Sequence, residues 1–506
     1  MLYPENALPQ AGQAKLTQNT GRIYQTDRRD RLLLAGTLVW CLLAVDGVLW
    51  AWPWGAGLTA AAVLWYVLVL GALGRRSLDR RENRVVLGAV GLLAATFLFT
   101  SNPWMRVWNV LALLGLIPLH LFSLSGTALV PWYRGAMVWE RLELLLLGCF
   151  GNLGASWAAL SPGDRKEKDL RRVLAGVLGA AGALALLGVL IPLLASGDAL
   201  FASATEWLRS FVQQHFVTAL WKIVMALVLT PFFFGLLYSL RRPKASAGPR
   251  REKALVTVDG LGFTLVLGAL AVLYLAFLAV QVAGLFGGAV YLAQRGISYA
   301  DWARSGFFQI TAVTAVNLTV LLAALTWSRP AGLTWRAVRI LAALVTGESL
   351  VLLASAAWRM TLYAGAYGLS FKRCLTYWGM AMMALFLLLA VWKLCRPAFS
   401  FWRWAAPAAL AGWLMLNCLP VDALVARNQV DRYLDGASQT LSVEYLTSLS
   451  YAVMPQLERL AGQKVLTDYG VRVSMDAVLA EQRAEAAAEC ADWRSWNLSA
   501  ALAAGH

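Results

Sequence analysis

The side chains best placed for chemistry lie on one stretch late in the chain. Arg359, Tyr363 and Tyr367 follow one another at intervals of four residues, a spacing that places them on one face of a helix. A guanidinium beside two phenol groups is suited to binding an anionic solute or head group. The alternative interpretation is structural, because aromatic side chains and an outward-reaching arginine also mark the interface between a membrane and water.

Two carboxyl groups lie inside apolar runs. Glu348 is near the middle of one run, and Asp46 is nearer the end of another. A carboxylate at the centre of a membrane helix costs roughly 2.5–3.5 kcal/mol, so each group needs a proton, a partner or a water-filled cavity. Asn317 is the predicted partner of Glu348, with Gln309 as an alternative. Each carboxyl is therefore a candidate for coupling or substrate contact, or else is structural and hydrogen-bonded to a neighbouring helix.

The sequence contains none of the common motifs of soluble catalysis. G-x-x-x-x-G-K-[ST], H-E-x-x-H, G-x-S-x-G and G-x-G-x-x-G are all absent. Three histidines and six cysteines without a C-x-x-C pair do not provide a usual zinc site. We therefore predict no metal and no cofactor, and the sequence leaves open whether Cys418 and Cys490 pair.

Composition indicates that these residues are positioned by a membrane fold. Hydrophobic residues make up 59% of the 506 residues and charged residues only 14%, against about 25% charged in a soluble domain. The mean hydropathy is +0.60. These values exclude an ordinary soluble enzyme and make the lipid bilayer the first expected partner. The net charge of +16 is typical of basic cytoplasmic loops, so no nucleic acid is expected.

Apolar runs of roughly 20 residues predict an all-α, polytopic membrane protein with about eleven spans. The first 31 residues are polar, lack the pattern of a signal peptide and are assigned to the cytoplasm, and residues 32–419 form the transmembrane domain. The predicted spans are Leu32 to Trp52, Gly55 to Gly74, Val85 to Thr100, Val107 to Ser125, Val173 to Ala195, Thr218 to Leu240, Leu261 to Leu285, Phe307 to Trp327, Ala337 to Trp358, Leu375 to Leu394 and Trp402 to Leu419.

A twelfth hydrophobic stretch, residues 140–160, is interrupted by Gly148, Gly151, Asn152 and Gly154. It is predicted to be an interfacial or re-entrant helix rather than a span.

The distribution of basic residues predicts the orientation. With the N-terminus inside, the cytoplasmic segments hold 29 of the 44 Lys and Arg residues, and the external loops and span edges hold eight. Basic residues resist translocation, so this asymmetry supports the assignment. An odd number of spans then places residues 420–506 outside the cytoplasm.

The C-terminal tail, residues 420–506, has a different composition. It carries seven basic and eleven acidic residues and no run long enough to span. Leu446, Leu449, Val453, Leu457 and Leu460 recur at steps of three and four, which predicts short helices with one apolar face. We therefore expect a small helical cap on the outer membrane face.

Five short motifs stand out in the second half of the chain: YADWARSGFF at 299–308, LYAGAYGLS at 362–370, DALVARN at 422–428, YLTSLS at 445–450 and WRSWNLS at 493–499. Together they resemble a family of bacterial polytopic membrane proteins classed as a domain of unknown function. The resemblance covers about residues 180–500 and implies a bacterial inner-membrane protein. It carries no catalytic residue, because the family has no established activity.

The predicted topology brings several of these motifs to the external face. We hypothesise an outward-facing site, roofed by the tail, in which three arginines bind an anion and three other side chains shape the pocket. Its members are Arg304, Arg359, Arg427, Tyr363, Tyr367 and Asp422.

Three classes of function remain open. The first is a transporter or binder of an anionic solute or lipid head group at this external site. The second is a membrane signalling or scaffold component whose tail or basic loops recruit a protein partner. The third is an intramembrane enzyme on lipid-linked substrates, with Glu348 or Asp422 as the base. An enzyme is the less favoured class, because no nucleophile–base pair can be named.

Overall fold

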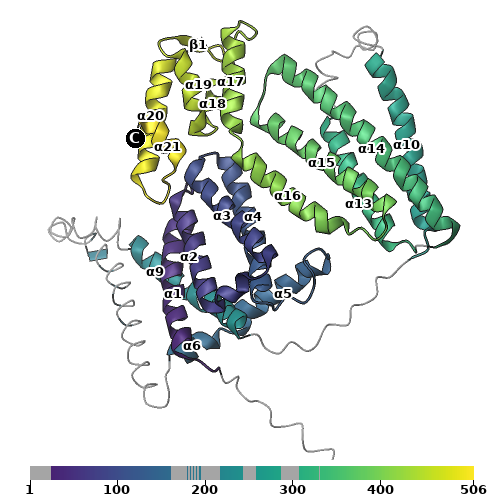
Figure 1. Cartoon of the computed structure of the whole chain (residues 1–506). Coiled ribbons are helices and arrows are strands. Elements are labelled where there is room, and N and C mark those ends of the chain that lie inside the picture. Colours follow the sequence, from purple (N-terminus) through teal and green to yellow (C-terminus); the bar gives the residue numbers. More distant parts are fainter. Residues whose placement is uncertain are drawn as a thin grey trace, which may run out of the picture. The chain divides into compact units, whose positions relative to one another are not determined.

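The computed structural model describes residues 24–160, 217–242, 258–286, 307–329 and 331–505, and isolated helical positions between 179 and 196 (Figure 1). The predicted span Val173 to Ala195 lies outside the described residues except at those positions. The predicted N-terminal segment is described only from residue 24.

Helices make up almost all of the described structure. Nine helices in the described ranges are long and apolar enough to cross a membrane, and the number rises to eleven if two bent helix pairs each form one span. The described strands form a single two-stranded sheet. The structure thus confirms an all-α, polytopic membrane fold, with a small β-element that the sequence did not predict.

The chain divides into two compact units, of which the first comprises Met1–Val45, Leu68–Leu73 and Glu143–Lys244. Its described elements are α1 (Arg28–Ala44), α6 (Gly154–Leu160), α9 (Val217–Arg241), the end of α2 (Ala56–Leu73) and most of α5 (Ala136–Gly151). Helix α1 packs against α9 and α6.

A cluster of charges fixes the beginning of α1 in the first unit. Asp27 caps the helix and accepts a hydrogen bond from the backbone N–H of Asp30 at 2.9 Å. Arg241 of α9 pairs with Asp27 at 2.7 Å and also with Asp30. The Arg241 guanidinium holds the pKa of Asp27 well below its ordinary value. The start of α1 and the end of α9 therefore share one polar layer.

The glycine-rich stretch predicted to interrupt a helix does bend the chain. Helices α5 and α6 meet at 44°. A Cβ added at Gly148 would lie 2.9 Å from Leu236 Cδ1, so glycine permits the close approach of α9 here. The interfacial or re-entrant placement of residues 140–160 stays a prediction.

The second unit comprises Asp46–Val67, Gly74–Leu142 and Ala245–His506. Besides parts of α2 and α5 it contains a π-helical turn, a 3₁₀ turn and seven long helices: η1 (Val45–Leu49, from Asp46 on), η2 (Arg75–Leu78), α3 (Arg81–Phe99), α4 (Pro103–Leu124), α10 (Leu261–Phe286), α13 (Phe307–Trp327), α14 (Gly332–Tyr367), α15 (Phe371–Cys395) and α16 (Phe401–Cys418).

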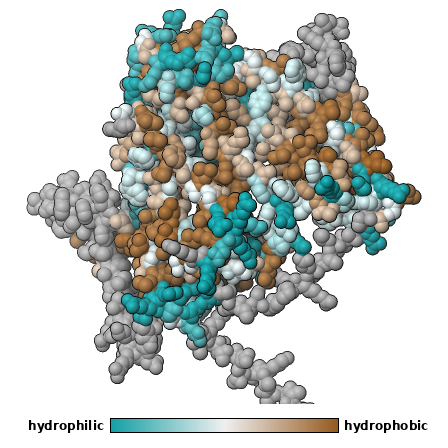
Figure 2. Space-filling view, viewed as in Figure 1, coloured by the Kyte–Doolittle hydropathy of each residue, from teal (hydrophilic) through white to brown (hydrophobic). Residues whose placement is uncertain are grey.

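Helix α14 is the central helix of a bundle with α10, α13 and α15. Its 36 residues span about 54 Å at 1.5 Å per residue, well beyond a hydrocarbon core of about 30 Å. Leu267, Leu321, Leu352 and Leu387 are buried between the four helices. Figure 2 shows largely hydrophobic surface over the outer helices of this bundle, as expected for helices that face lipid.

The tail begins where the chain bends. Helix α16 meets α17 (Val421–Leu434) at 51°, across Leu419 and Pro420. Asp422, Arg427, Asp431 and Arg432 make α17 far more polar than a span. We therefore treat α16 as the last membrane helix.

Beyond α17 the tail is a compact set of short elements. They are α18 (Val443–Thr447), η4 (Tyr451–Val453), α19 (Met454–Leu457), η5 (Glu458–Leu460), β1 (Lys464–Leu466), β2 (Arg472–Ser474), α20 (Met475–Ala491) and α21 (Leu498–Ala504). The five apolar residues of the predicted face, Leu446 to Leu460, are all buried in one core. The hydrophilic side chains of the tail cover its outer surface (Figure 2).

The tail is not purely helical, because β1 and β2 pair as an antiparallel hairpin. Gly470 supplies a positive φ of 77° in its turn, a conformation that favours glycine. Tyr469, next to it, is 78% exposed. Each strand has only three residues, too few for the alternation by which sequence reveals a strand.

Candidate functional site

In the second unit, three chain turns that the topology predicts on one side of the membrane all contact the tail. The turn before α2 donates from the backbone N–H of Gly55 to the carbonyl of Arg494 at 3.1 Å. The α3–α4 turn reaches the tail through Asn102, and the α14–α15 turn through Leu369. The tail is therefore docked on the ends of several helices, and this junction is the candidate functional region.

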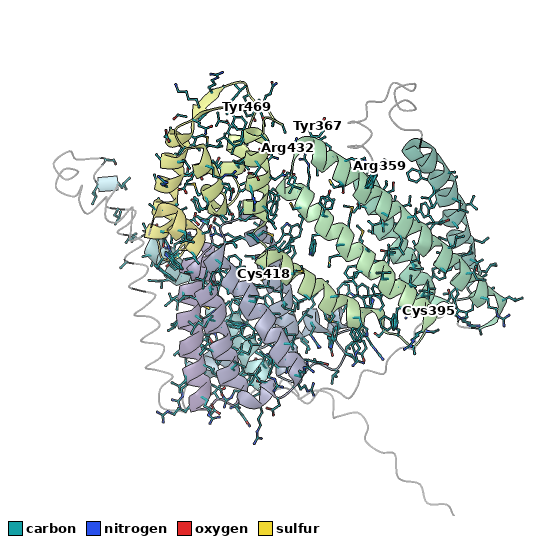
Figure 3. The ribbon with its side chains drawn as sticks, turned by 45° about the horizontal axis from the view of Figure 1, so that its top comes forward. Arg359, Tyr367, Cys395, Cys418, Arg432 and Tyr469 are labelled. Carbon is teal, nitrogen blue, oxygen red and sulfur yellow. The ribbon has the colours of Figure 1, made fainter. Side chains whose placement is uncertain are left out.

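Two arginines donate hydrogen bonds to the last carbonyl groups of α14. Arg432 of α17 donates to the carbonyl oxygens of Gly365 and Ala366, both at 2.7 Å. Arg373 donates to the carbonyls of Tyr367, at 3.2 Å, and Gly368. The last carbonyls of a helix lack partners within the helix, and cations there are favoured by its dipole. Figure 3 shows Arg432 near Tyr367 at this end of α14.

The turn after α14 is held by hydrogen bonds from α17 and α18. The side-chain oxygen of Asn428 accepts from the backbone N–H of Leu369, and Gln429 donates to its carbonyl, both at 2.6 Å. The backbone N–H of Phe371 donates to the Tyr445 hydroxyl at 2.7 Å. LYAGAYGLS, DALVARN and YLTSLS, three of the motifs behind the family resemblance, thus meet in space.

The motif WRSWNLS contacts the turn before α2. The backbone N–H of Ala56 donates to the carbonyl of Trp496 at 3.0 Å. Arg494 pairs with Asp46 at 3.1 Å and with Asp492 at 2.5 Å. Asp46 therefore has an ionic partner in the tail, which the sequence did not reveal.

The structure brings together two of the six residues predicted to form an anion pocket. The rings of Tyr363 and Tyr367 lie 4.9 Å apart. The guanidinium that covers Tyr363, at 4.4 Å, belongs to Arg373. Arg359 is buried within α14 and only 5% exposed (Figure 3). The aromatic part of the pocket is thus present, with a different arginine beside it.

The remaining predicted pocket residues have other surroundings. Asp422 is buried, and both of its carboxylate oxygens accept from the Asn102 side-chain amide, at 2.9 and 2.8 Å. Burial raises the pKa of Asp422 above its ordinary value. Arg427 is mostly exposed and lies 3.7 Å from Asp431 one turn along. Arg304 lies outside the described residues. Anion binding by this set stays a prediction.

The predicted pairing of Glu348 with Asn317 is wrong. The Asn317 side chain accepts from the Tyr274 hydroxyl at 2.6 Å and donates to the Ser349 hydroxyl at 2.9 Å. Both carboxylate oxygens of the buried Glu348 lack a hydrogen-bond partner among the described residues. The amide thus bonds to two neutral hydroxyls and not to the carboxyl group of Glu348. Gln309, the alternative partner, lies on the exposed surface of α13.

A cavity of about 170 Å³ opens between the tail and the turns that precede α2 and α4. Arg106 of α4 lines it, is 2% exposed, and pairs with Glu489 of α20 at 3.2 Å. Tyr451, Gln482 and Glu485 complete the polar part of the wall, and Trp52 lines it as well. All of these residues belong to the second unit.

Hydrogen bonds fix the polar wall of the cavity. Glu489 also accepts from the Asn497 amide at 2.8 Å, and Gln482 donates to Glu485 at 2.9 Å. Burial, together with Glu489, raises the pKa of Tyr451 well above its ordinary value, so its phenol stays neutral. One guanidinium faces two carboxylates, which gives the wall a net negative charge.

No group of three or more His, Cys, Asp or Glu side chains within the described ranges is arranged to hold a metal ion. The six cysteines, all described, are free thiols, so Cys418 and Cys490 do not pair.

A family model described as Domain of unknown function (DUF4153) matches residues 87–460. The chain belongs to this family. The match confirms the resemblance to a family of unknown function. It begins earlier than the sequence motifs indicated, within α3, and ends at residue 460, before the motif WRSWNLS. No curated protein and no solved structure matches the chain.

Four residues of the junction were not predicted from the sequence: Asn102, Arg106, Arg432 and Glu489. Asn102 directly precedes Pro103 and an apolar run, which is a signal for the start of a helix but not for a bond to Asp422. The partners of the other three are distant in sequence, and no local spacing reveals them.

Proposed function

We propose that this integral membrane protein binds a small polar solute, or the head group of a lipid, in the cavity between α4 and the tail. The ligand class is a small amine or polyol. A net negative wall attracts an ammonium group, and its carboxylate and amide oxygens accept hydrogen bonds from hydroxyls. The proposal keeps the binding function expected from the sequence and changes the sign of the expected ligand charge.

The buried Arg106–Glu489 pair carries this proposal. Removing two charges from water costs several kcal/mol per ion, and apolar residues of similar volume often stabilise a fold as well or better. A pair placed in the wall of a cavity, with Tyr451 and Glu485 nearby, is therefore better explained by ligand recognition than by stability.

The size of the cavity limits the ligand. Its volume of about 170 Å³ is below the roughly 300–1,000 Å³ of pockets for drug-sized molecules. A compound or head group of few heavy atoms fits.

A binding measurement with a matched pair of variants tests the proposal. Thermal unfolding of the full chain in detergent is recorded with a panel of small amines, polyols and organic anions. We expect at least one amine or polyol to raise the midpoint, and Glu485→Gln to abolish that shift. Glu481→Gln, one turn away on α20 and outside the cavity, should retain it. A shift given only by anions, or lost equally in both variants, would contradict the proposal.

We also propose that the tail and this cavity face outward from a bacterial inner membrane, with the N-terminus in the cytoplasm. The asymmetry of basic residues supports this orientation. Two exposed cysteines at opposite ends of the α15–α16 hairpin test it: Cys418 beside the tail and Cys395 beside the basic loop (Figure 3). A membrane-impermeant maleimide applied to intact cells should label Cys418 and spare Cys395. Cys418→Ser and Cys395→Ser identify which cysteine is labelled. Labelling of Cys395 but not of Cys418 would mean that the topology is the reverse of the one proposed.

A further inference from the structure

We propose that Glu348 is a proton-binding site inside the membrane, which exchanges its proton with water on the tail side of the protein through the α13–α14 interface. The inference is independent of the proposed cavity ligand. On uptake, the carboxylate forms one O–H bond with a proton from water. On release, that bond breaks and the proton returns to water.

The surroundings of Glu348 require a bound proton in the resting state. The side chain is 4% exposed, and neither oxygen has a hydrogen-bond partner among the described residues. A buried carboxylate without a compensating charge is far more costly than a neutral carboxyl. The nearest amide, that of Asn317, is hydrogen-bonded to Tyr274 and Ser349 and not to Glu348.

The charged and titratable groups around Glu348 are few. Helix α10 carries a single titratable side chain, Tyr274, which lies within electrostatic range of Glu348. Helix α13 has none. On α15 the nearest cation along the antiparallel helix is Lys393, whose ammonium donates to the carbonyl of Phe399 beyond the helix end. Arg359, on α14 itself, is eleven residues away, about 16 Å along the axis. Among the described residues, no counter-ion is thus built in at the level of Glu348.

Two unbonded polar groups lie between Glu348 and the tail side. The hairpin of α13 and α14 is antiparallel, and Asn317 contacts Ser349. Thr311 of α13 lies six residues from Asn317 toward the tail side, and Ser355 of α14 lies six residues from Ser349 in the same direction. The two residues are therefore at the same level along the helices. Both hydroxyl oxygens are buried and unbonded among the described residues. Such hydroxyls are free to donate to and accept from a transient water chain.

On the other side of Glu348, the interface has no unbonded hydroxyl near Glu348 among the described residues. Val345, Ala342 and Val338 of α14 and Leu321 and Ala324 of α13 are all at most 1% exposed. The nearest hydroxyls on this side, Thr346 and Thr319, each donate to the carbonyl four residues earlier in their own helix, and the unbonded Ser328 lies just beyond the far end of α13. We therefore expect exchange on the tail side.

Infrared difference spectroscopy of the full chain in lipid tests the proposal. We expect a carbonyl stretch of a protonated carboxyl near neutral pH that disappears in Glu348→Gln, falls as the pH rises, and shifts when H₂O is replaced by D₂O. Asp422→Asn is the control for a second buried acid and should leave this band in place. Tyr274→Phe, which keeps Glu348, should move the band rather than remove it, and so identifies Glu348 even if Glu348→Gln misfolds.

A pair of identical substitutions tests the path. Thr311→Val, on the tail side, should slow the D₂O shift roughly tenfold, the factor expected for losing one hydrogen bond on the path. Thr346→Val, on the side away from the tail, should leave the rate unchanged. A missing band, a band insensitive to D₂O, or equal effects of the two variants would overturn the proposal. A band that sodium removes at constant pH would also overturn it, in favour of a cation site.

Discussion

Two carboxyl groups in the described part of the second unit, Asp422 and Glu348, are buried in opposite ways. Asp422, at the tail junction, receives two hydrogen bonds from Asn102. Glu348, within the helix bundle, receives none from the described residues. A saturated buried group stabilises one structure, whereas an unsatisfied one costs free energy and is retained for another reason. Asp422 therefore stabilises the tail junction around the cavity. Glu348, in the bundle, is a group whose protonation is free to change.

The largest expected effect is at the junction, where a buried ion pair is broken. Arg106→Met should lower the free energy of unfolding by about 3–5 kcal/mol, because Glu489 is left buried without its cation. Arg106→Met with Glu489→Leu should regain most of this loss. Unfolding in detergent, followed by tryptophan fluorescence, provides the measurement. A double variant no more stable than the single one would show that the pair is worth more than its burial costs.

A smaller effect is expected at the turn after α14. Gly368 has a φ of 75°, and an added Cβ would lie 2.9 Å from Gln429 Nε2. Gly368→Ala should therefore cost about 2 kcal/mol, from the left-handed backbone and the displaced amide. The matched control is Gly365→Ala, a helical position with open space around it, which should be neutral or stabilising by up to ~1 kcal/mol. Equal losses in the two variants would contradict the docking described for this turn.

The pH dependence of the free energy of unfolding tests the environment of the Asp422 carboxyl group. Burial raises the pKa of Asp422 in the folded protein above its ordinary value of 3.8, so the folded state holds its proton to higher pH than the unfolded state. The stabilising contribution is complete below about 3.8 and is lost as the pH rises through the folded pKa. Asp422→Asn should flatten this part of the stability curve recorded in detergent. An unchanged curve would mean that hydrogen bonds from Asn102 balance the effect of burial on this pKa, and a slope of opposite sign would mean that they outweigh it.

Local patterns predicted the parts of this molecule that depend on local physics. The spacing of Leu446 through Leu460 predicted the buried face of the tail, and the spacing of Tyr363 and Tyr367 predicted their contact. Arg432 escaped because its bonds to Gly365 and Ala366 join segments more than 60 residues apart. Asn317 was matched to Glu348 by chemical type, but Tyr274 and Ser349 lie closer in the packed bundle. Packing decides which residues pair over long distances in the sequence, and no local pattern in a single sequence shows these pairs.

The smallest expected change in the free energy of unfolding best tests the comparison between Glu348 and Asp422. Glu348→Leu should leave the free energy of unfolding unchanged or raise it by up to ~1 kcal/mol, because an unbonded polar group is replaced by an apolar one. Asn317→Leu, one helix away, should lower it by about 1–3 kcal/mol, since two hydroxyls lose their partner. Both are measured by unfolding in detergent. If Glu348→Leu were as destabilising as Asn317→Leu, Glu348 would be structural like Asp422, and its retention in the membrane would need no exchangeable proton.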